Sequence, residues 1–472
     1  MNRRETDLIV IGGGAVGENV ADRASQGGLD TVIVEAELVG GECSYWACIP
    51  SKALLRSPQA LSAARAVPGA AEAVTGELDL AKVLERRDAF TSNWSDEGQV
   101  RWLESAGIDL VRGHGRLSGE REVTVTDAEG RVTVLTARHA VAVATGSVAR
   151  MPSIPGLAEA GAWSSRDATS VEQVPVSLAI IGGGVVAAEM ATAFAALGSE
   201  VTVIARHGLL GGMEPFAGER VAAALRDRGV TVRTDTTTER VSRDERGVTV
   251  HTSAGAITAA EVLVATGRTA ATEDLGLESV GLEAGGHLEV DDTMLVRGFD
   301  WLYAVGDVNG RALLTHQGKY QARAAGDVIA ARARGERVRD ETWGAHVATA
   351  DHYAVPQVVF TDPEVAAVGL TEAQARERGV HARTVDFDPG QVAGASLLRE
   401  GYEGLARMIV DEDRRTLVGA TFVGPDVAEL LHAATTAIVG EIPIERLWHA
   451  VPSFPTVSEI WLRLLEAYGR PS

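Results

Sequence analysis

A glycine-rich turn occurs twice in this chain, and each copy follows a short apolar segment. LIVIGGGAVGE (residues 8–18) is repeated in design as LAIIGGGVVAAE (residues 178–189), and an alanine-rich helical pattern follows each copy. Strand, glycine turn and helix in this order form the start of a βαβ unit. The sequence therefore predicts an α/β fold with two nucleotide-binding units of related design in series.

The first turn fits the dinucleotide-binding fingerprint G-x-G-x-x-G with Gly12, Gly14 and Gly17. These glycines permit a tight turn, close approach of the backbone to a pyrophosphate, and close packing of helix on strand. The segment TVIVE then ends at Glu35, which lies 23 residues after Gly12. A carboxylate at that place is suited to hold ribose hydroxyl groups.

The second turn has Gly182, Gly184 and Ala187 in the same three places. The same offset of 23 residues leads to an alanine at position 205, followed by Arg206 and His207. A guanidinium favours a 2′-phosphate, whereas a carboxylate would repel it. The sequence thus predicts NADPH rather than NADH, with a solvated surface role for Arg206 as the alternative.

A second pair of related segments indicates how the domains are nested. VAVATGS ends at Ser147 and VLVATGR ends at Arg268, and AVGD follows at 304–307 as a return to the first unit. We expect a discontinuous first domain (1–150 and 272–345) with the second nucleotide-binding domain (151–271) inserted. From about His346 the pattern changes without a further glycine fingerprint, which predicts a third, α+β domain over 346–472.

The chain has 2 cysteines, Cys43 and Cys48, both in GGECSYWACIPSK (residues 40–52). In one regular helix, residues five apart are about 7.5 Å apart along the axis, whereas a disulfide requires Cα atoms closer than about 7 Å. A bonded pair would therefore need Cys43 at an irregular first turn, with Cys48 well inside the helix. Two buried free thiols are the alternative that spacing alone leaves open.

Composition excludes several classes of function. The formal net charge of −21, without a basic tract, gives no electrostatic footprint for nucleic acid or an anionic membrane. No apolar run approaches the roughly 18–20 residues of a membrane span, so we expect a cytoplasmic protein. Two cysteines are too few for a disulfide-stapled scaffold or a multi-cysteine metal site, and no metal is expected.

Taken together, the motifs resemble those of the flavoprotein disulfide reductases, the pyridine nucleotide–disulfide oxidoreductase family that includes lipoamide dehydrogenase and mercuric reductase. The resemblance covers essentially the whole chain and includes the cysteine segment, both glycine turns, both ATG segments, AVGDV (304–308), VVFTDPEVAAVGLTE (358–372) and FPTVSE (454–459). It implies FAD on the first domain, the nicotinamide nucleotide on the second, and a third domain that forms a homodimer with shared active sites.

The resemblance also implies roles for single residues. Cys48 resembles the charge-transfer thiol and Cys43 the interchange thiol, while Lys52 and Glu189 would pair close to the flavin. The residues expected at the cofactors are Gly12, Gly14, Gly17, Glu35, Gly41, Lys52, Gly115, Thr145, Gly146, Asp307, Thr315 and His316 for FAD, and Gly182, Gly184, Ala187, Glu189, Arg206, His207, Gly267 and Arg268 for the nicotinamide nucleotide. Among these, Glu35 would hold the adenosine ribose and Asp307 the ribityl chain.

One position departs from the family pattern. Disulfide-reducing members have a histidine before Pro-Thr in the C-terminal motif, where it acts as acid and base and is held by a glutamate of the same motif. Here the residue is Phe454, which carries no proton, although Glu459 is present. Acid–base catalysis typically contributes about 10²–10⁴-fold, so ordinary disulfides should turn over slowly. His449 is an unsuitable substitute because Pro452 and Pro455 favour extended chain.

Three functions remain open at this point. The first is an FAD-dependent NADPH oxidoreductase that cycles a Cys43–Cys48 disulfide and reduces a disulfide or a related acceptor. The second is a diaphorase, quinone reductase or transhydrogenase-like enzyme in which the cysteines are peripheral. The third is a non-catalytic FAD-binding or redox-sensing module. Mercuric ion reduction is not favoured, because those enzymes carry a further C-terminal cysteine pair and no cysteine follows Cys48.

Overall fold

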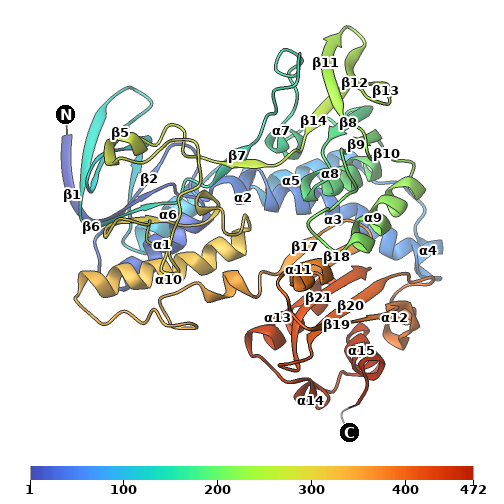
Figure 1. Cartoon of the computed structure of the whole chain (residues 1–472). Helices are drawn as coiled ribbons and strands as arrows, with labels where there is room; N and C mark the ends of the chain where they lie inside the picture. The colour runs from blue at the N-terminus through green and yellow to red at the C-terminus, as the bar shows by residue number, and fades with distance from the viewer. Residues whose placement is uncertain (1, 471–472) are drawn as a thin grey trace. The chain divides into compact units, whose positions relative to one another are not determined.

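The computed structural model describes residues 2–470, and its contacts divide the chain into two compact units. Unit 1 consists of Met1–Pro50, Asp88–Arg150 and Arg268–His352, and unit 2 of Ser51–Arg87, Met151–Gly267 and Tyr353–Ser472. The elements of both are labelled in Figure 1.

Unit 1 is built on a sheet in which β1 is central and parallel to its neighbours β2 and β6. The strand order is β3-β2-β1-β6-β5-β4, with β16 also paired in parallel to β6. The strands are β1 (Asn2–Ile11), β2 (Thr31–Glu35), β3 (Asp109–Arg112), β4 (His114–Gly119), β5 (Glu122–Thr126), β6 (Val132–Val143) and β16 (Leu302–Ala304). The C-terminal ends of β1 and β6 are short apolar runs, LIVI and AVAV, as expected of parallel strands that are covered on both faces.

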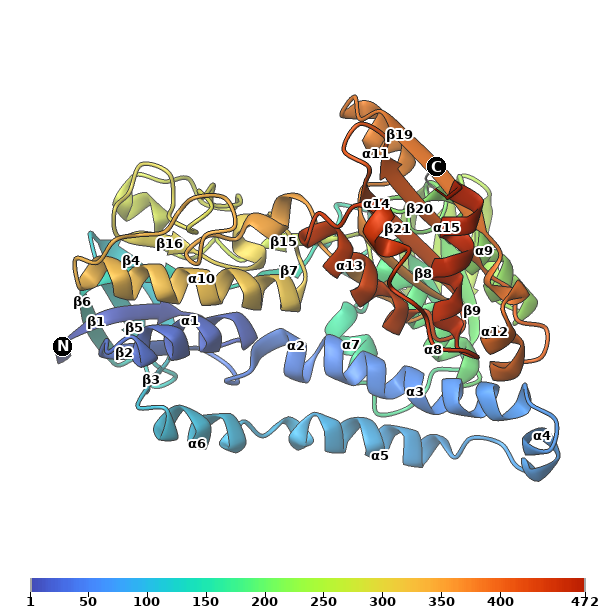
Figure 2. The same ribbon diagram turned by 90° about the horizontal axis from the view of Figure 1, so that it is seen from below.

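Two helices of unit 1 pack side by side over this sheet. They are α1 (Ala15–Gln26), which begins directly after the first glycine turn, and α10 (Thr315–Ala333), and both views show them as neighbours (Figures 1 and 2). Their closest approach needs a glycine, since a Cβ at Gly318 would lie 2.6 Å from Cγ2 of Val16. An apolar core of α1, α10, β1 and β6 side chains stabilises this layer. The shorter helix α6 (Glu97–Ser105) precedes β3.

Unit 2 contains a second parallel sheet of related design. Its strand order is β10-β9-β8-β14, and the strands are β8 (Ser177–Ile181), β9 (Glu200–Ile204), β10 (Thr231–Arg233) and β14 (Glu261–Val264). The register repeats that of unit 1, because Ile181 faces Ile204 as Ile11 faces Val34, 23 residues apart in both cases. The equal offset explains why the two glycine turns share one sequence spacing.

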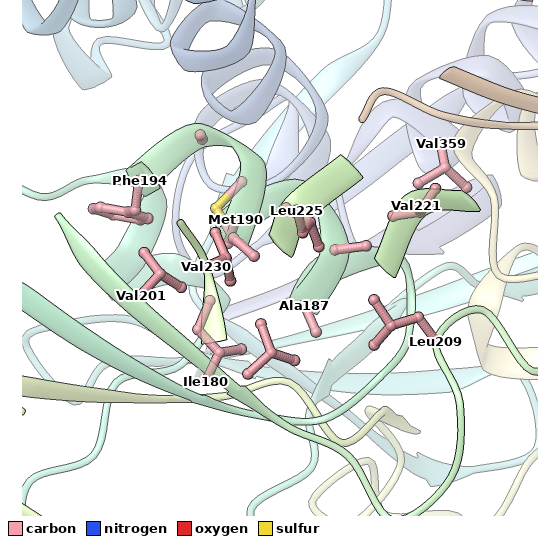
Figure 3. Close-up of a cluster of buried hydrophobic side chains, with 14 of the residues drawn as sticks. Ile180, Ala187, Met190, Phe194, Val201, Leu209, Val221, Leu225, Val230 and Val359 are labelled. Carbon is pink, nitrogen blue, oxygen red and sulfur yellow. The ribbon is translucent and has the colours of Figure 1, made fainter. Parts of the chain in front are cut away.

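Helices and small sheets complete this part of unit 2. Alanine-rich α8 (Val185–Ala196) and α9 (Pro215–Asp227) pack through Ala187, Met190, Phe194 and Leu225 into the buried cluster of Figure 3. The remaining elements are α3 (Cys48–Arg65), α4 (Ala70–Ala73), α5 (Leu80–Phe90), α7 (Ser165–Thr169), and the antiparallel sheet β11 (Thr238–Asp244), β12 (Gly247–Thr252) and β13 (Gly255–Ala259). The short strands β7 (Ser147–Ala149) and β15 (Arg268–Ala270) pair antiparallel within unit 1.

The C-terminal part of unit 2 is an antiparallel sheet with helices, as the α+β pattern predicts. Its strand order is β17-β18-β21-β20-β19. The strands are β17 (Gln357–Val359), β18 (Glu364–Gly369), β19 (Ala382–Phe387), β20 (Leu405–Asp411) and β21 (Thr416–Gly424), with helices α11 (Glu372–Glu377), α12 (Ala393–Leu398), α13 (Leu431–Val439), α14 (Ile444–Leu447) and α15 (Ile460–Tyr468). The expected fold class, two Rossmann-type units and a C-terminal α+β domain, is confirmed.

Candidate cofactor and disulfide site

The first glycine turn has a backbone that side chains would obstruct. Gly12 has φ +102°, and a Cβ there would lie 2.4 Å from the carbonyl oxygen of Ala144. A Cβ at Gly17 would lie 1.9 Å from the carbonyl oxygen of Gly12, whereas at Gly14 it would meet nothing closer than 3.8 Å. The turn is therefore closed on its protein side and open at Gly14, before the N-terminus of α1, where free N–H groups favour a phosphate.

Glu35 ends β2 and is fixed against this turn. Its Oε2 accepts a hydrogen bond from the Gly13 backbone N–H at 2.6 Å, and its Oε1 accepts one from the Glu37 N–H at 2.7 Å. Burial raises the pKa of Glu35, and these two hydrogen bonds oppose the rise. A carboxyl group so placed fits the hydroxyl groups of an adenosine ribose.

The ATG segment after β6 leaves a polar atom without a partner. The hydroxyl Oγ1 of Thr145 is buried and forms no hydrogen bond within residues 2–470. The next residue, Gly146, has φ +71° and would have open space around a Cβ. An orphaned hydroxyl beside an open backbone fits a nucleotide that would bind there.

Asp307 and Arg268 meet at Ser147. Ser147 Oγ donates to Asp307 Oδ2 at 2.6 Å and accepts from Arg268 Nε at 2.7 Å. Arg268 also donates to the Ser147 carbonyl oxygen at 2.6 Å and lies 3.4 Å from Oε1 of Glu42. Arg268, expected at the nicotinamide nucleotide, is thus bound to protein groups of unit 1.

Two other expected FAD residues lie at close backbone approaches. Gly41 has φ +60°, and a Cβ there would lie 2.7 Å from the Cα of Gly14 in the first turn. Gly115 lies in β4, where a Cβ would lie 2.9 Å from Cγ1 of Val34. Gly41 therefore borders the proposed phosphate cradle, and Gly115 packs directly on β2.

The cysteines lie on either side of a break between two helices. Cys43 is in the short helix α2 (Gly41–Tyr45), and Cys48 is the first residue of α3 rather than well inside a helix. Both are free thiols, and Sγ of Cys48 lies 3.3 Å from Oγ1 of Thr315 at the start of α10. A hydrogen bond with Cys48 and burial raise the pKa of the Cys43 thiol above its ordinary value.

A left-handed turn holds the segment between the cysteines. Ser92, Asn93 and Trp94 have φ values of +52°, +51° and +55°, which non-glycine residues rarely adopt. The indole N–H of Trp94 donates to the Tyr45 carbonyl oxygen at 3.2 Å, and the Tyr45 hydroxyl donates to the Val39 carbonyl oxygen at 3.1 Å. The turn therefore fixes the end of α2.

The second glycine turn, in unit 2, is constructed like the first. A Cβ at Gly182 would lie 2.2 Å from the carbonyl oxygen of Ala265, whereas nothing lies within 4 Å of one at Gly184. Ala187 is fully buried in α8, and Gly267 has φ +123°. Arg206 and His207 follow β9 with exposed side chains. They are free to meet a 2′-phosphate there, although the surface role of Arg206 is equally compatible.

Lys52 and Glu189 form the ion pair that the sequence predicts, within unit 2. Lys52 Nζ lies 2.7 Å from Glu189 Oε2, and Glu189 is 3% exposed. Glu189 Oε1 accepts a hydrogen bond from the Phe360 N–H at 3.0 Å, and the Lys52 ammonium lies 5.0 Å from the centre of the Phe360 ring. Three segments distant in sequence therefore determine the position of this lysine.

In the C-terminal motif, Glu459 is paired with Arg463. Its Oε1 accepts a hydrogen bond from Arg463 at 2.6 Å, while its Oε2 is buried without a hydrogen bond within residues 2–470. Phe454 is 76% exposed, and Val451 is 84% exposed on the same segment. Glu459 therefore keeps one carboxylate oxygen that could accept a further hydrogen bond.

Of the remaining residues near the site, two histidines were considered from the sequence and three charged residues were not predicted. His316 and His449 have exposed side chains. Glu42, which pairs with Arg268, was missed, as were Lys319, which interacts electrostatically with Cys43, and Glu18, which interacts electrostatically with Lys319. The spacing Thr315–Lys319, one helical turn, was the available signal for Lys319.

No group of three or more His, Cys, Asp or Glu side chains is arranged to hold a metal ion in the described part of the chain. Among the helices of residues 2–470, none is both long and apolar enough to cross a membrane.

Comparison with known proteins gives matches along nearly the whole chain. Residues 6–327 match the family model described as pyridine nucleotide-disulphide oxidoreductase, and residues 355–464 match the dimerisation domain of that family. The chain is 33% identical over 469 residues to dihydrolipoyl dehydrogenase 2 of Haloarcula marismortui, covering 96% of this chain and 94% of that protein. It is 31% identical over 460 residues to mercuric reductase of Staphylococcus aureus, covering 96% and 80%.

A solved structure is similar throughout. The Cu(II) complex of the HOCl-induced flavoprotein disulfide reductase RclA from Escherichia coli has a TM-score of 0.84 at 25% identity, covering 98% of this chain and 99% of that chain. The match extends over both glycine turns and the C-terminal domain.

Proposed function

Because this chain belongs to the pyridine nucleotide–disulphide oxidoreductase family, we propose that it is an FAD-dependent NADPH oxidoreductase that cycles a Cys43–Cys48 disulfide. The observation that carries the proposal is the placement of both thiols at the break between α2 and α3, with Cys48 against Thr315. A helix break permits the close Cα approach that a disulfide requires and a continuous helix does not.

The residues of unit 1 fit FAD. The open backbone at Gly14, the anchored carboxyl of Glu35 and the orphaned hydroxyl of Thr145 would bind its phosphates, ribose and polar edge. FAD, when bound, supplies two-electron transfer between a nicotinamide and a disulfide. Asp307 would bind the ribityl chain once Ser147 gives up its hydrogen bond to that carboxylate.

The nucleotide is NADPH in this proposal, with NADH as the poorer donor. Arg206 and His207 supply positive charge and hydrogen-bond donors after β9, and position 205 supplies no carboxylate. Lys52 and Glu189 would hold a fixed charge on the route of the hydride. A buried ion pair is poor support for stability, so a role in the reaction is the better explanation of this one.

The acceptor is a disulfide, or a related acceptor whose leaving group needs little protonation. Phe454 supplies no acid, so an acceptor that needs a proton would react slowly. The homodimer that the dimerisation domain implies would bring the exposed Val451–Phe454 segment into a shared interface. A quinone-reducing diaphorase is the second proposal, favoured by the same absence of an acid.

Anaerobic reduction of the holoenzyme tests the proposal. NADPH should release two thiols and produce the long-wavelength absorption of a thiolate beside oxidised flavin. Cys48→Ser should abolish disulfide turnover and that absorption. Quinone reduction by Cys48→Ser at the full parent rate, together with no release of thiols in the parent, would favour the diaphorase.

The nucleotide preference has a separate test. Arg206→Glu should weaken NADPH by about tenfold or more, since it replaces an attraction with a repulsion, and should spare NADH. Exposed Arg131, in an ion pair with Asp127, gives a matched control when changed to Glu. Equal KM values for NADPH and NADH in the parent enzyme would contradict the preference.

A further inference from the structure

This chain uses arginine for nearly every basic side chain. Of its 44 basic residues, three are lysines (Lys52, Lys82 and Lys319), which leaves 41 arginines. Lys82 is exposed and paired with Glu85 at 2.6 Å, and Lys52 is paired with Glu189. A guanidinium serves a solvated surface equally well, whereas an ammonium is a compact point charge that can lose its proton. Lys319 is thus the lysine whose presence needs an explanation.

Lys319 lies on the side of α10 that carries the cysteine contact. Thr315, whose Oγ1 is 3.3 Å from Sγ of Cys48, is four residues earlier, and residues four apart share one helix face. Lys319 is half-buried, and its ammonium forms no ion pair or hydrogen bond within residues 2–470. A half-buried cation without a fixed partner is costly, and it can stabilise a negative charge that forms nearby during a reaction.

Two acidic groups interact electrostatically with the Lys319 ammonium. One is the Cys43 thiol, whose pKa is raised by its hydrogen bond with Cys48 and by burial and is lowered first by a hydrogen bond with Thr315 and then by the charge of Lys319. The other is Glu18 of α1, whose Oε1 is buried with no hydrogen-bond partner in the described chain. Burial raises the pKa of Glu18 to about 7; Lys319 opposes that rise and Glu35 adds to it.

We propose that Lys319 is a positioning residue for Cys43, whose ammonium holds the negative charge of the interchange thiolate in this chain that lacks a histidine at 454. The inference rests on the proposed function. When two electrons from the nicotinamide nucleotide enter the disulfide, its S–S bond breaks and two thiolates form. Cys48 has the hydroxyl of Thr315 beside it, and Lys319 offsets the charge on Cys43.

The ionisation state of Glu18 determines how strongly the Lys319 ammonium stabilises the Cys43 thiolate. A protonated Glu18 leaves the ammonium free for Cys43, whereas an ionised Glu18 competes for it across the contact of α1 with α10. Besides Lys319, the charged or titratable groups that face Glu18 are Glu35 from β2 and Tyr45 from α2. Removing the Glu18 charge should therefore favour the thiolate, and removing the Lys319 charge should disfavour it.

The test is the pH dependence of Cys43 alkylation in FAD-loaded enzyme. The protein is reduced with dithiothreitol, freed of reductant anaerobically and treated with iodoacetamide, and the modified cysteine is located by peptide mass spectrometry. Lys319→Met should shift the midpoint for Cys43 upward by about one pH unit, which makes alkylation about tenfold slower below the midpoint. Lys319→Arg should keep most of the parent behaviour, and Glu18→Gln should shift the midpoint downward.

Lys82→Met is the matched control, since it removes an exposed lysine that is paired on α5. FAD content and thermal midpoint, measured on each variant, separate loss of charge from loss of fold. Superimposable profiles for the parent and a folded Lys319→Met would overturn the inference, as would an equal shift in Lys319→Arg. Chemical reduction makes this result independent of NADPH: failure of NADPH to release the thiols would overturn the proposed function, whatever the alkylation profile shows.

Discussion

Among single residues, Glu364 at the start of β18 is expected to make the stability of the fold depend on pH. Its Oε2 accepts a hydrogen bond from the Ala428 N–H at 3.1 Å, yet burial raises its pKa from 4.5 to about 7. Between these two values the folded chain binds more protons than the unfolded chain. The stability that Glu364 contributes as a neutral acid is therefore present below about pH 4.5 and is lost as the pH rises toward 7.

Glu364→Gln keeps a hydrogen-bond acceptor and removes the charge. We expect the variant to be more stable than the parent by about 2 kcal/mol at pH 8 and equal to it at pH 4.5. Thermal midpoints at the two pH values measure this, with exposed Glu129→Gln as the control. An equal gain at both pH values would show that the charge is not the cause.

Phe454→His tests the missing acid. The buried Oε2 of Glu459 lacks a partner and could accept the ring N–H of an introduced histidine. We expect disulfide reduction to rise by about tenfold or more and to acquire a pH dependence near 6.5. Glu459→Gln in the same background should lose most of the gain. If neither variant reduces disulfides faster than the parent, then substrate binding limits the rate rather than proton supply.

At the scale of elements, the left-handed turn Ser92–Trp94 is the support of α2. Asn93 tolerates its φ of +51°, whereas a β-branched residue would not. Asn93→Val should lower the free energy of unfolding by about 1–3 kcal/mol and loosen residues 41–46, while Asn93→Gly should be close to neutral. Hydrogen exchange of the α2 amides measures the loosening. Unchanged protection in a destabilised Asn93→Val would mean that the turn does not hold α2.

The sequence predicted those elements whose cause is local. Glycine turns have a steric requirement that is visible in the letters, and the offset of 23 residues placed Glu35 correctly at the end of β2. The turn at Ser92 contains no glycine and could not be found this way. Arg268 is separated from its partner Ser147 by 121 residues. Tertiary packing brings the two together, and no local sequence pattern indicates it.

The break between α2 and α3 was predictable only in part. Spacing showed that Cys43 and Cys48 could not bond within one regular helix, yet it did not show that Cys48 would begin the second helix. The hydrogen bonds to Tyr45 that fix the break come from residues about 50 positions later. The need for a break between the two cysteines was therefore predictable, whereas the residues that fix the break were not.

At the scale of the whole molecule, Arg407 of β20 joins two parts of unit 2. It lies 3.0 Å from Glu214 at the start of α9, 3.1 Å from Glu372 of α11 and 2.7 Å from Asp386 of β19. Glu214 is 2% exposed, so its carboxylate depends on this guanidinium. The network makes the second nucleotide-binding part and the C-terminal part of unit 2 stable together.

Arg407→Met should destabilise the protein by about 3–5 kcal/mol, because it leaves a buried carboxylate unpaired. Unfolding in urea, followed by circular dichroism, measures the loss, with exposed Arg131→Met as a control that should change little. The double variant Arg407→Met/Glu214→Gln should recover part of the loss. No recovery would locate the cost in lost packing against Phe216, whose ring centre lies 5.1 Å from the guanidinium.

The scarcity of lysine also determines how this protein responds to amine-directed chemistry. An acylating reagent meets three lysine side chains, of which Lys82 is exposed on α5 while Lys52 and Lys319 are shielded. Among the lysine side chains, gentle labelling would therefore modify Lys82 first. Forcing conditions would reach the other two lysines, so loss of activity with each added label would count the functional amines directly.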